Sequence, residues 1–470
     1  MKIKTRFSPS PTGNLHIGSV RTALYAWLFA KKNKGSFVLR IEDTDLERSN
    51  LKSVKSIIDG LKWLGLNWDE GPYFQSQRLI RYQKVIDFML HEKLAYRCYC
   101  SVNRLDRLRS KQLSKGLKPR YDHHCRNLNN KDNHKLQHVV RFRNPLTGSV
   151  TFNDLIRGKI IHYNNELDDL IIQRSNGMPT YNFVVVIDDV DMDITHVIRG
   201  EDHVSNTPRQ INIFNALSKK EPVYAHVSMI LNHEGKKLSK RDVNVSNIIH
   251  FRELGFLPES ILNYLVRLGW SYGNQELFTM NEMIEFFSFD NINNSASIFN
   301  IDKMLWYNNY YINNLPKEYI INLLHKCFEK EKIDTHSGPN MIDLITIMGP
   351  RCNTLKKIVD DSIYFYVQEI DYDLNQIKLY LDKYSILILK MMYKKIFLMV
   401  DWNLNNLSGV IKECTIQLKI SFKKAATILR LALSGKIYTP SISLVLYYIG
   451  KKRSLIRIKD FLLKINDLNF

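Results

Sequence analysis

The first twenty residues constrain the fold of this chain most strongly, because they predict a strand, a turn and a helix in immediate succession. Lys2 to Ser8 has the pattern of a strand, and three turn-favouring residues follow it, namely Pro9, Pro11 and Gly13. Apolar residues then recur at helical spacing, at Ile17, Val20, Leu24 and Leu28. This spacing predicts a helix that begins near His16.

The start of this helix is a candidate site for an anion. The N–H groups of a first helical turn have no partner inside the helix and favour negative charge. Gly18 lets a ligand approach the backbone closely, and His16 adds a side-chain donor at the same place. The alternative is an ordinary strand, turn and helix in which the histidine is incidental.

A second basic element, Gly235 to Arg241, lies far downstream and follows an apolar run. It carries four cations, Lys236, Lys237, Lys240 and Arg241. A loop that neutralises a triphosphate needs mobile ammonium groups of this kind. The alternative is a solvated basic turn or a targeting-like patch.

Together the two elements resemble the two signatures of class I aminoacyl-tRNA synthetases, His-Ile-Gly-His and Lys-Met-Ser-Lys-Ser. They read here as His16-Ile-Gly-Ser19 and Lys237-Leu-Ser-Lys-Arg241. Four further stretches narrow the resemblance to the bacterial glutamyl-tRNA synthetases: Arg6 to His16, Leu39 to Arg48, Trp68 to Pro72 and Val197 to Asp202. The resemblance is strongest from Met1 to Trp306 and is traceable to the end of the chain.

The resemblance implies a pocket for glutamate. It assigns to this substrate Arg6, Ser8, Ser10, Glu42, Tyr181 and Arg199. Glu42 follows the strand predicted over 36–41 and would receive the ammonium group, while Tyr181 opens a segment that we expect to be an apolar strand. Arg6 and Arg199 should both lie at strand carboxyl ends, and two guanidinium groups in one cleft favour an acid over neutral glutamine.

Two alternatives concern the acidic residues near this pocket. Either arginine could pair with Asp45 or Asp202 instead of a substrate. We also expect Asp43 or Asp45 to cap a helix over residues 45–60.

The resemblance further implies an ATP site and a reaction. The ATP-binding residues would be Pro9, Gly13, His16, Gly18, Ser19, Lys237, Ser239, Lys240 and Arg241, with His16, Gly18 and Lys240 the catalytic ones and Mg²⁺ accompanying ATP. The glutamate carboxylate would attack the α-phosphorus, and no side chain need act as a base, because a carboxylate is already a nucleophile at neutral pH. Catalysis would then come from positioning and charge stabilisation. Transfer to tRNA(Glu) follows, and class membership implies attack by the 2′-hydroxyl.

The length of 470 residues predicts about three structural units. By resemblance, the plan is a Rossmann-type α/β catalytic domain in two halves, an inserted α+β domain that binds the tRNA acceptor end, and all-α C-terminal domains. The boundaries are 1–75 with 192–245 for the catalytic domain, 76–191 for the insertion, 246–320 for a helical stem-contact region and 321–470 for a helical anticodon-binding region. An all-helical tail separates the chain from glutaminyl-tRNA synthetases, which carry β-barrels there.

Three cysteines of the insertion form a candidate zinc site. Cys98, Cys100 and Cys125 could provide thiolates for a tetrahedral ion. Bacterial glutamyl-tRNA synthetases of one branch carry zinc here with Cys-x-Cys and Cys-x-His signatures, but this chain has Asn127 at the final position. We expect Tyr121 as the fourth ligand, with His123 or His124 as alternatives, or loss of the metal.

The remaining composition bears on partners and location. Lys and Arg number 67 and Asp and Glu 47, so the formal net charge of +20 suits RNA, although codon drift toward AT-rich sequence would also raise it. The start of the chain lacks the features of a signal peptide, and Ser385 to Val400 is interrupted by lysines and predicts an amphipathic buried helix. Six cysteines are too few for a disulfide framework. We therefore expect a cytoplasmic monomer that does not enter a membrane.

Two other functions would fit part of the same set of residues. A glutamyl-queuosine-type paralogue would share the catalytic half but lack an anticodon-binding domain, and the helical region after residue 320 argues against it. A non-catalytic tRNA-binding protein would not need the intact set of His16, Gly18, Glu42, Arg199 and Lys240. The sequence leaves open whether tRNA(Gln) is charged as well.

Overall fold

The computed structural model describes residues 2–45, 49–128, 137–238, 247–382 and 384–466. The chain forms two compact units. Unit 1 consists of Met1–His250 and Pro258–Ile301, and unit 2 of Phe251–Leu257 and Asp302–Phe470.

A seven-stranded sheet forms the centre of unit 1, with the strand order β3-β2-β1-β9-β10-β6-β7. Its strands are β1 (Lys4–Phe7), β2 (Ser36–Ile41), β3 (Glu70–Phe74), β6 (Ser149–Asp154), β7 (Gly158–Tyr163), β9 (His196–Gly200) and β10 (Val223–Val227). All neighbouring pairs are parallel except β6 and β7. The predicted Rossmann-type core is therefore confirmed.

The hairpin of β6 and β7 extends this central sheet from within the segment 76–191. Asp154 at the end of β6 pairs in register with Tyr224 of β10. Part of the segment expected to be a separate insertion thus shares one sheet with the strands that flank it.

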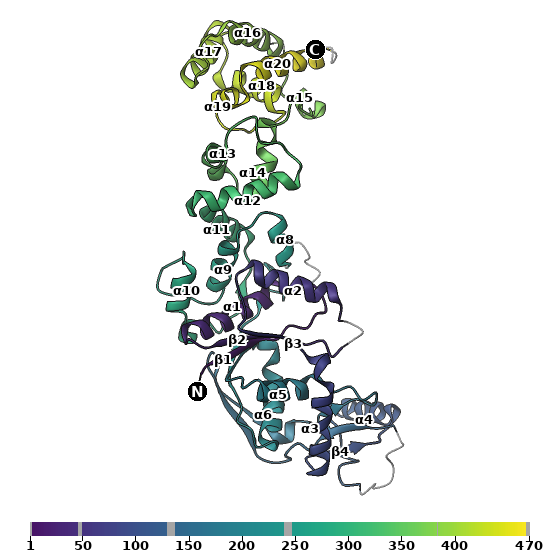
Figure 1. Ribbon diagram of the computed structural model, residues 1–470. Helices are drawn as coiled ribbons and strands as arrows, with labels where there is room; N and C mark the ends of the chain where they lie inside the picture. The colour runs from purple at the N-terminus through teal and green to yellow at the C-terminus, as the bar shows by residue number, and fades with distance from the viewer. Residues whose placement is uncertain (1, 46–48, 129–136, 239–246, 383, 467–470) are drawn as a thin grey trace. The chain divides into compact units, whose positions relative to one another are not determined.

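Helices cover both faces of the sheet. Figure 1 shows α1 (Ile17–Lys32) and α2 (Leu51–Trp63) on one side, and α5 (Tyr181–Asp191) and α6 (Thr207–Ala216) on the other. Every residue of β2 is buried, as expected for a parallel strand with both faces covered. The helix predicted near His16 is confirmed, because α1 begins at Ile17 with His16 as its N-cap.

The predicted start of the second helix is wrong. The helix begins at Leu51, and its cap is Asn50, whose side chain accepts a hydrogen bond from the Ser53 N–H. Asp43, one of the two expected caps, instead accepts hydrogen bonds from the backbone and hydroxyl of Ser76. Asp and Asn are both good caps, so residue type alone does not choose between them.

The strand predicted to begin at Tyr181 is also wrong, because this segment forms helix α5. Its apolar run from Phe183 to Ile187 is buried against neighbouring helices and the small sheet described below. A short continuous apolar run has no period that separates a buried strand from a buried helix. Tyr181 therefore opens a helix at the edge of the sheet.

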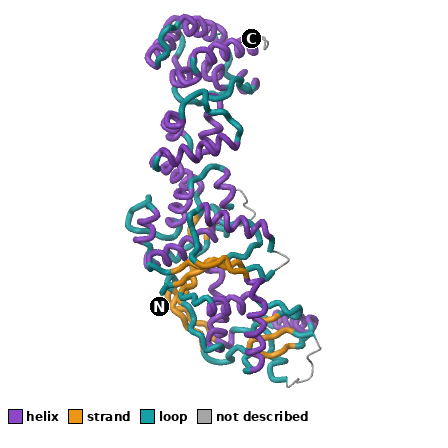
Figure 2. Tube along the Cα trace, in the orientation of Figure 1, coloured by secondary structure: helices purple, strands orange, loops and turns teal. Residues whose placement is uncertain are grey.

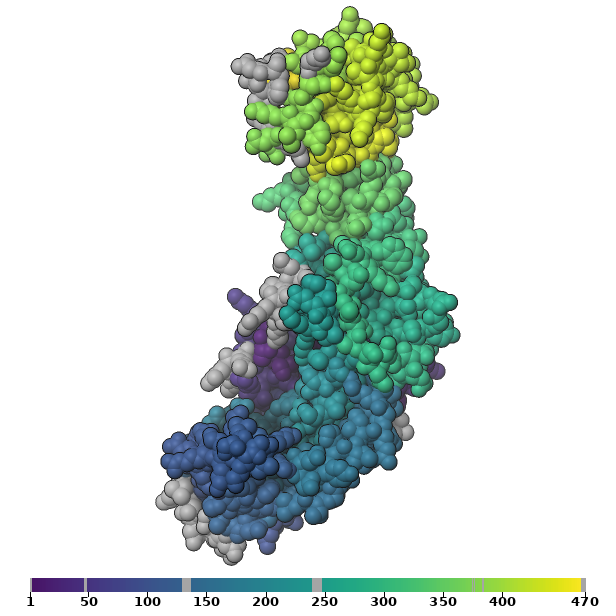
Figure 3. All heavy atoms as spheres, turned by 180° about the vertical axis from the view of Figure 1, so that it is seen from behind, coloured from purple at the N-terminus to yellow at the C-terminus, as the bar shows by residue number. Residues whose placement is uncertain are grey.

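The outer part of the segment 76–191 holds a second, three-stranded antiparallel sheet in the order β4-β5-β8. Its elements are β4 (Ala95–Cys98), β5 (Val139–Phe142) and β8 (Ile171–Gln173), with helices α3 (Leu79–His91) and α4 (Val102–Ser114). No residue of α4 is buried. In the space-filling view of Figure 3, the dark-blue atoms of this region gather in a protruding lobe.

Unit 1 is completed by short elements after β10. They are β11 (Ile230–Leu231), β12 (Ser297–Ile298), α9 (Pro258–Arg267) and α10 (Met280–Phe286), while α8 (Ile248–Glu253) spans the first boundary between the units. Arg21 of α1 fixes these segments to the first helix, because its buried guanidinium donates to the carbonyls of Ser228 and Leu268.

The described residues of unit 2 form helices and loops without a strand, as the purple tubes of Figure 2 show. The helices are α11 (Ile301–Asn314), α12 (Lys317–Lys330), α13 (Met341–Met348), α14 (Leu355–Ser362), α15 (Leu374–Lys378), α16 (Ser385–Leu398), α17 (Leu404–Gln417), α18 (Phe422–Ser434), α19 (Ile442–Ile449) and α20 (Lys451–Asn466). The predicted all-helical C-terminal region is confirmed. Among the described residues, no helix combines the length and apolar character that crossing a bilayer requires.

The basic stretch Lys451 to Arg453 has a structural use in unit 2. Lys451 donates to the carbonyl of Met399, and the Arg453 guanidinium donates to the carbonyl of Phe365. Of the three cations, only Lys452 is exposed. The stretch therefore offers less free charge to a partner than its sequence indicates.

Candidate active site

A cavity of about 580 Å³ opens at the carboxyl ends of β1, β2 and β9. Open α/β sheets bind their ligands at this edge. Most residues that the sequence assigns to glutamate or ATP line it, namely Arg6, Ser8, Pro9, Ser10, His16, Gly18, Ser19, Glu42, Tyr181, Arg199 and Lys237. Gly13 is not among the lining residues, and Ser239, Lys240 and Arg241 lie outside the described residues.

His16 and Gly18 lie together at the start of α1. The backbone N–H of Gly18 donates to Nδ1 of His16 over 3.0 Å. The neutral imidazole therefore carries its proton on Nε2. We expected the Gly18 N–H to be available to an anion, but it is bonded to the His16 side chain. A Cβ atom added at Gly18 would lie 3.3 Å from Nδ1 of His16.

Arg6 belongs to a buried charge network. Its side chain donates to Oδ1 of Asp189 on α5 over 3.3 Å, and Arg40 donates to the same oxygen over 2.7 Å. Burial favours the neutral form of Asp189, but the charges of Arg40 and Arg6 outweigh it and lower the pKa of this carboxyl. The partner of Arg6 is therefore Asp189, and not Asp45 or Asp202 as the alternative supposed.

Arg199 is held differently, by neutral groups only. Its guanidinium donates to Nε2 of His226 over 3.1 Å and to Gln210 and Thr207 over 2.8 Å each. No carboxylate in the described part of the chain forms an ion pair with it, so the pairing with Asp45 or Asp202 is not observed here either. At 6% exposure, Arg199 presents a buried positive charge to the cavity, and Asp189 attracts this charge without forming an ion pair with it.

Glu42 supplies a negative charge on the same edge. Burial raises its pKa to about 7, although Arg40 and Arg6 oppose this shift. One carboxylate oxygen lies 3.5 Å from the Arg40 guanidinium. The cavity thus has an acidic group that an ammonium ion would ionise fully, together with an arginine that a carboxylate would neutralise.

Tyr181 and Lys237 complete the lining. The Tyr181 hydroxyl lies 3.2 Å from Nδ1 of His203, and burial raises its pKa to about 12, so the hydroxyl stays protonated. Lys237 pairs with Asp202 over 3.0 Å, and both side chains are exposed. An exposed pair of this kind contributes little stability and leaves Lys237 available for another anion.

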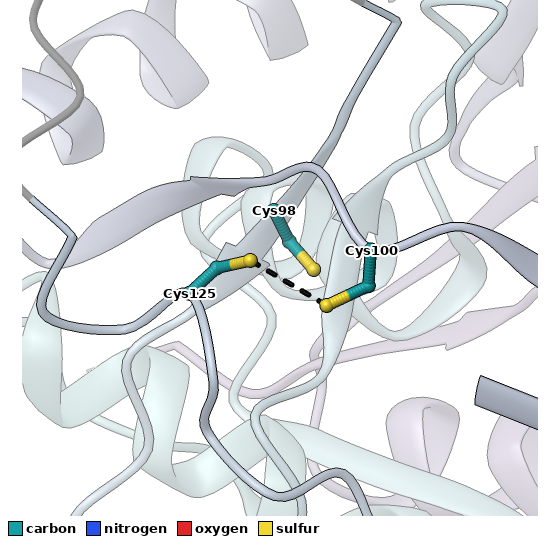
Figure 4. Close-up of side chains that lie close together, drawn as sticks. All are labelled: Cys98, Cys100 and Cys125. Carbon is teal, nitrogen blue, oxygen red and sulfur yellow. Dashed lines mark hydrogen bonds between the residues drawn. The ribbon is translucent and has the colours of Figure 1, made fainter. Parts of the chain in front are cut away.

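The three cysteines of the candidate zinc site lie together, as Figure 4 shows. Their sulfur atoms all lie within 4.8 Å of one another, and those of Cys100 and Cys125 are 3.5 Å apart. Tetrahedral zinc with Zn–S bonds of about 2.3 Å needs sulfurs roughly 3.8 Å apart. The donor set therefore fits the ion.

Among the candidates for the fourth ligand, Tyr121 lies nearest the sulfurs. Its hydroxyl is 3.3 Å from the sulfur of Cys98 and 3.6 Å from that of Cys100. The other candidates have other partners or are exposed. Asn127 accepts from Arg143, His123 bonds to Asp169, and His124 faces solvent.

Three groups of the site escaped the sequence analysis. Asp189 and Arg40 form the network around Arg6, and His226 holds Arg199. An acid that follows the apolar run of α5 and a histidine inside the apolar strand β10 are the signals that could have revealed two of them, because such residues are rarely buried without a partner.

Comparison with known proteins agrees with this geometry. Residues 2–306 match the family described as "tRNA synthetases class I (E and Q), catalytic domain", and residues 315–462 match "Anticodon binding domain". The chain belongs to the class I tRNA synthetases (E and Q).

The similarity to known proteins extends along the whole chain. A protein named Glutamate--tRNA ligase from Buchnera aphidicola subsp. Acyrthosiphon pisum is 54% identical over 468 residues, and one of the same name from Buchnera aphidicola subsp. Baizongia pistaciae is 52% identical over 470 residues; both alignments cover 100% of each chain. A crystal structure described as a glutamate tRNA ligase from Elizabethkingia meningosepticum in complex with its amino acid has a TM-score of 0.85 at 31% identity. That match covers 98% of this chain and 99% of the other.

Proposed function

We propose that this protein acts as a glutamate–tRNA ligase, which joins L-glutamate to the 3′ end of tRNA(Glu) at the expense of ATP. The observation that carries the proposal is the buried Arg199, which lines the cavity and forms no ion pair with any carboxylate of the described residues. Its charge needs an anionic ligand, and the side-chain carboxylate of glutamate supplies one. The two full-length relatives named above support the same activity.

The two ends of the substrate bind to different charges. The ammonium group binds Glu42 and draws it into the ionised form, while the side-chain carboxylate binds Arg199, with Arg6 and Tyr181 beside it. Asp189 already compensates Arg6, so Arg199 dominates the recognition of the acid. Neutral glutamine would leave the buried Arg199 charge uncompensated, which is costly.

In the first step, the α-carboxylate of glutamate attacks the α-phosphorus of ATP and pyrophosphate leaves. The Nε2–H of His16 and the ammonium groups of Lys237 and Lys240 stabilise the negative charge that grows on the phosphates. Mg²⁺ accompanying ATP would supply further positive charge to the same phosphates. The residues Pro9, Gly18 and Ser19 hold the nucleotide against the start of α1.

In the second step, the terminal adenosine of tRNA attacks the adenylate and AMP leaves. Another cavity of about 500 Å³ shares Tyr181 with the first and is lined by three arginines, Arg141, Arg174 and Arg209, together with Asp168 and Asp169. We place the 3′ end of the tRNA along these arginines, since arginines bind phosphates well. The segment 76–191 would then bind the acceptor end.

Unit 2 would read the anticodon end. Arg351 donates to the carbonyl of Thr439, and Arg430 donates to the hydroxyl of the same residue. Tyr438 beside them is 85% exposed and could stack on an unpaired base. The match to an anticodon-binding domain supports this role and argues against a paralogue without such a domain.

We also propose that Cys98, Cys100, Tyr121 and Cys125 bind one zinc ion, which would fix the loop around Tyr121 to β4 and have no part in the chemistry. Metal analysis of protein purified without chelator should give about one zinc per chain. A Cys125→Ser variant should give much less. A zinc content near zero in the unaltered protein would show that these residues do not form a zinc site.

The activity is tested by charging purified tRNA(Glu) and tRNA(Gln) separately with labelled glutamate and ATP. We expect charging of tRNA(Glu) and release of pyrophosphate, and the outcome with tRNA(Gln) decides whether the anticodon is read strictly. Arg351→Ala should weaken discrimination between the two tRNAs while leaving the KM for glutamate unchanged. We further propose that the enzyme works as a monomer in the cytoplasm, which size measurement in solution and localisation of the tagged protein would test.

A further inference from the structure

The residues behind Arg199 form a chain of hydrogen bonds that ends at a buried carboxylate outside the cavity. Nε of Arg199 donates to Nε2 of His226, and Nδ1 of His226 lies 2.6 Å from Oδ2 of Asp154. His226 and Asp154 are fully buried in their side chains. Neither residue lines the cavity.

The direction of these bonds fixes the tautomer of His226. An arginine Nε can only donate, so Nε2 of His226 must carry a lone pair and accept the bond. The proton of the neutral ring must then lie on Nδ1, from which it is donated to Asp154. Burial lowers the pKa of His226, which keeps the ring neutral at pH 7. A doubly protonated ring would lose the acceptor and add a second cation beside Arg199.

Asp154 is held in turn by the backbone. Its Oδ1 accepts from the N–H groups of Ile156 and Arg157 over 3.0 and 2.9 Å, and the carboxylate also accepts from the N–H of His226. These bonds position the carboxylate at the end of β6, where that strand pairs with β10. The negative charge of Asp154 therefore acts on Arg199 only through a neutral ring.

We propose that Asp154 and His226 are positioning residues that orient Arg199 toward the substrate and so set the preference for glutamate over glutamine, an inference that rests on the proposed function. A direct carboxylate partner would hold Arg199 equally firmly but would neutralise it. The neutral imidazole accepts a hydrogen bond from the guanidinium through its lone pair and does not neutralise the positive charge of Arg199, which can therefore attract an anionic ligand. In protein sites, a histidine whose one ring nitrogen is held by a carboxylate commonly orients the group that contacts its other ring nitrogen.

The alternative is that this pair only joins β6 to β10. Loss of such a link would lower thermal stability without a specific change toward glutamate. The two roles therefore predict different kinetics, and a variant in the core of β6 serves as the control. Val150 is buried in the apolar cluster of this strand and is remote from the hydrogen-bonded chain, so Val150→Ala should lower the melting temperature alone.

Two substitutions at His226 test the roles of its two ring nitrogens separately. His226→Asn keeps a polar atom near Nδ1 for Asp154 but has none to accept from Arg199, whereas His226→Gln extends an oxygen toward the place of Nε2. In tRNA charging by the full chain, we expect His226→Asn to raise the KM for glutamate roughly tenfold to a hundredfold, the cost of one hydrogen bond to a charged group. The glutamate-to-glutamine ratio of kcat/KM should fall similarly, the KM for ATP should stay within about twofold, and His226→Gln should recover part of the loss.

Asp154→Asn gives a second reading if His226→Asn does not fold. The amide can donate to Nδ1, which moves the histidine proton to Nε2 and points it at Arg199, so the same loss of glutamate affinity is expected. If these variants keep the glutamate KM and selectivity of the unaltered protein and only melt earlier, as Val150→Ala should, the positioning role is wrong while the proposed function stands. If the unaltered protein does not charge glutamate, the proposed function itself fails.

Discussion

Arg199 of unit 1 and Arg457 of unit 2 are both buried, and neither forms an ion pair with a described carboxylate. Arg457 is 2% exposed and donates to the carbonyls of Leu433 and Val367 over 2.6 and 2.5 Å. Arg199 donates to side chains and lines a cavity. Burial of an arginine therefore does not by itself mark a binding site.

The difference lies in what remains of the charge after the protein contacts are made. Burial lowers the pKa of Arg457 to about 10, and its N–H groups close loops of the helical unit. The Arg199 guanidinium is oriented by neutral groups at the carboxyl edge of a sheet, where a ligand can reach it. The first arginine therefore stabilises the fold, and the second should select the substrate.

The largest effect is expected for Arg199→Ala. Loss of the charged hydrogen bonds to the substrate carboxylate should cost about 3 kcal/mol of transition-state stabilisation. The value of kcat/KM for glutamate should therefore fall more than a hundredfold, while the KM for ATP changes little. Steady-state charging of tRNA measures both constants. A variant that binds glutamate normally and only melts earlier would place Arg199 in the same class as Arg457.

His16→Ala should have the next largest effect. His16 lines the cavity with its proton on Nε2, so its loss removes one donor for the growing phosphate charge. The expected decrease in kcat is about a hundredfold, with little change in the KM for glutamate. Single-turnover adenylate formation checks this. A proportionate rise in the glutamate KM would instead mean that His16 acts on binding.

The pH dependence of binding gives a smaller effect. Burial raises the pKa of Glu42 to about 7, and the substrate ammonium binds only the carboxylate form. The ionised fraction falls roughly tenfold between pH 8 and pH 6, so the Kd for glutamate should rise by about that factor on acidification. Calorimetry at the two pH values measures it. His203 does not interfere, because burial lowers its pKa to about 4.

The control for this profile is Glu42→Gln, which should bind glutamate weakly and equally at both pH values. A flat profile in the unaltered protein would show that Glu42 is not the partner of the ammonium group.

The smallest effect on activity is expected for Arg457→Ala. The change leaves two carbonyls without their donors and should lower the free energy of unfolding of unit 2 by about 3 kcal/mol. The KM values for glutamate and ATP should stay unchanged below the melting temperature. Thermal melting followed beside charging kinetics tests this, and a selective rise in the glutamate KM would remove the contrast between the two arginines.

The sequence predicted the strands that meet at the cavity, and most residues that it assigned to glutamate or ATP line this cavity. Turn residues and a clear change from strand to helix period located β1 and α1, and the apolar run before Glu42 located β2 at Ser36–Ile41. The charged residues that end these strands were therefore expected at one edge, where the structure has them.

The partners of those residues could not be predicted. Arg6 and Asp189 are 183 positions apart, and His226 reaches Asp154 across 72 positions, so no local pattern joins them. The helix α5 was mistaken for a strand because its apolar run has no distinguishing period. Sequence patterns thus predicted many of the groups that line the cavity, whereas the groups that hold them depend on how distant strands and helices meet.

The most direct test of the account compares glutamate and glutamine as substrates of the unaltered protein, with purified tRNA(Glu) and saturating ATP. Arg199 has no ion-pair partner among the described carboxylates, so we predict that kcat/KM for glutamate exceeds that for glutamine by at least about a thousandfold, since glutamine would leave this buried cation unpaired. Comparable values for the two amino acids would contradict the claim that Arg199 selects the substrate by its charge.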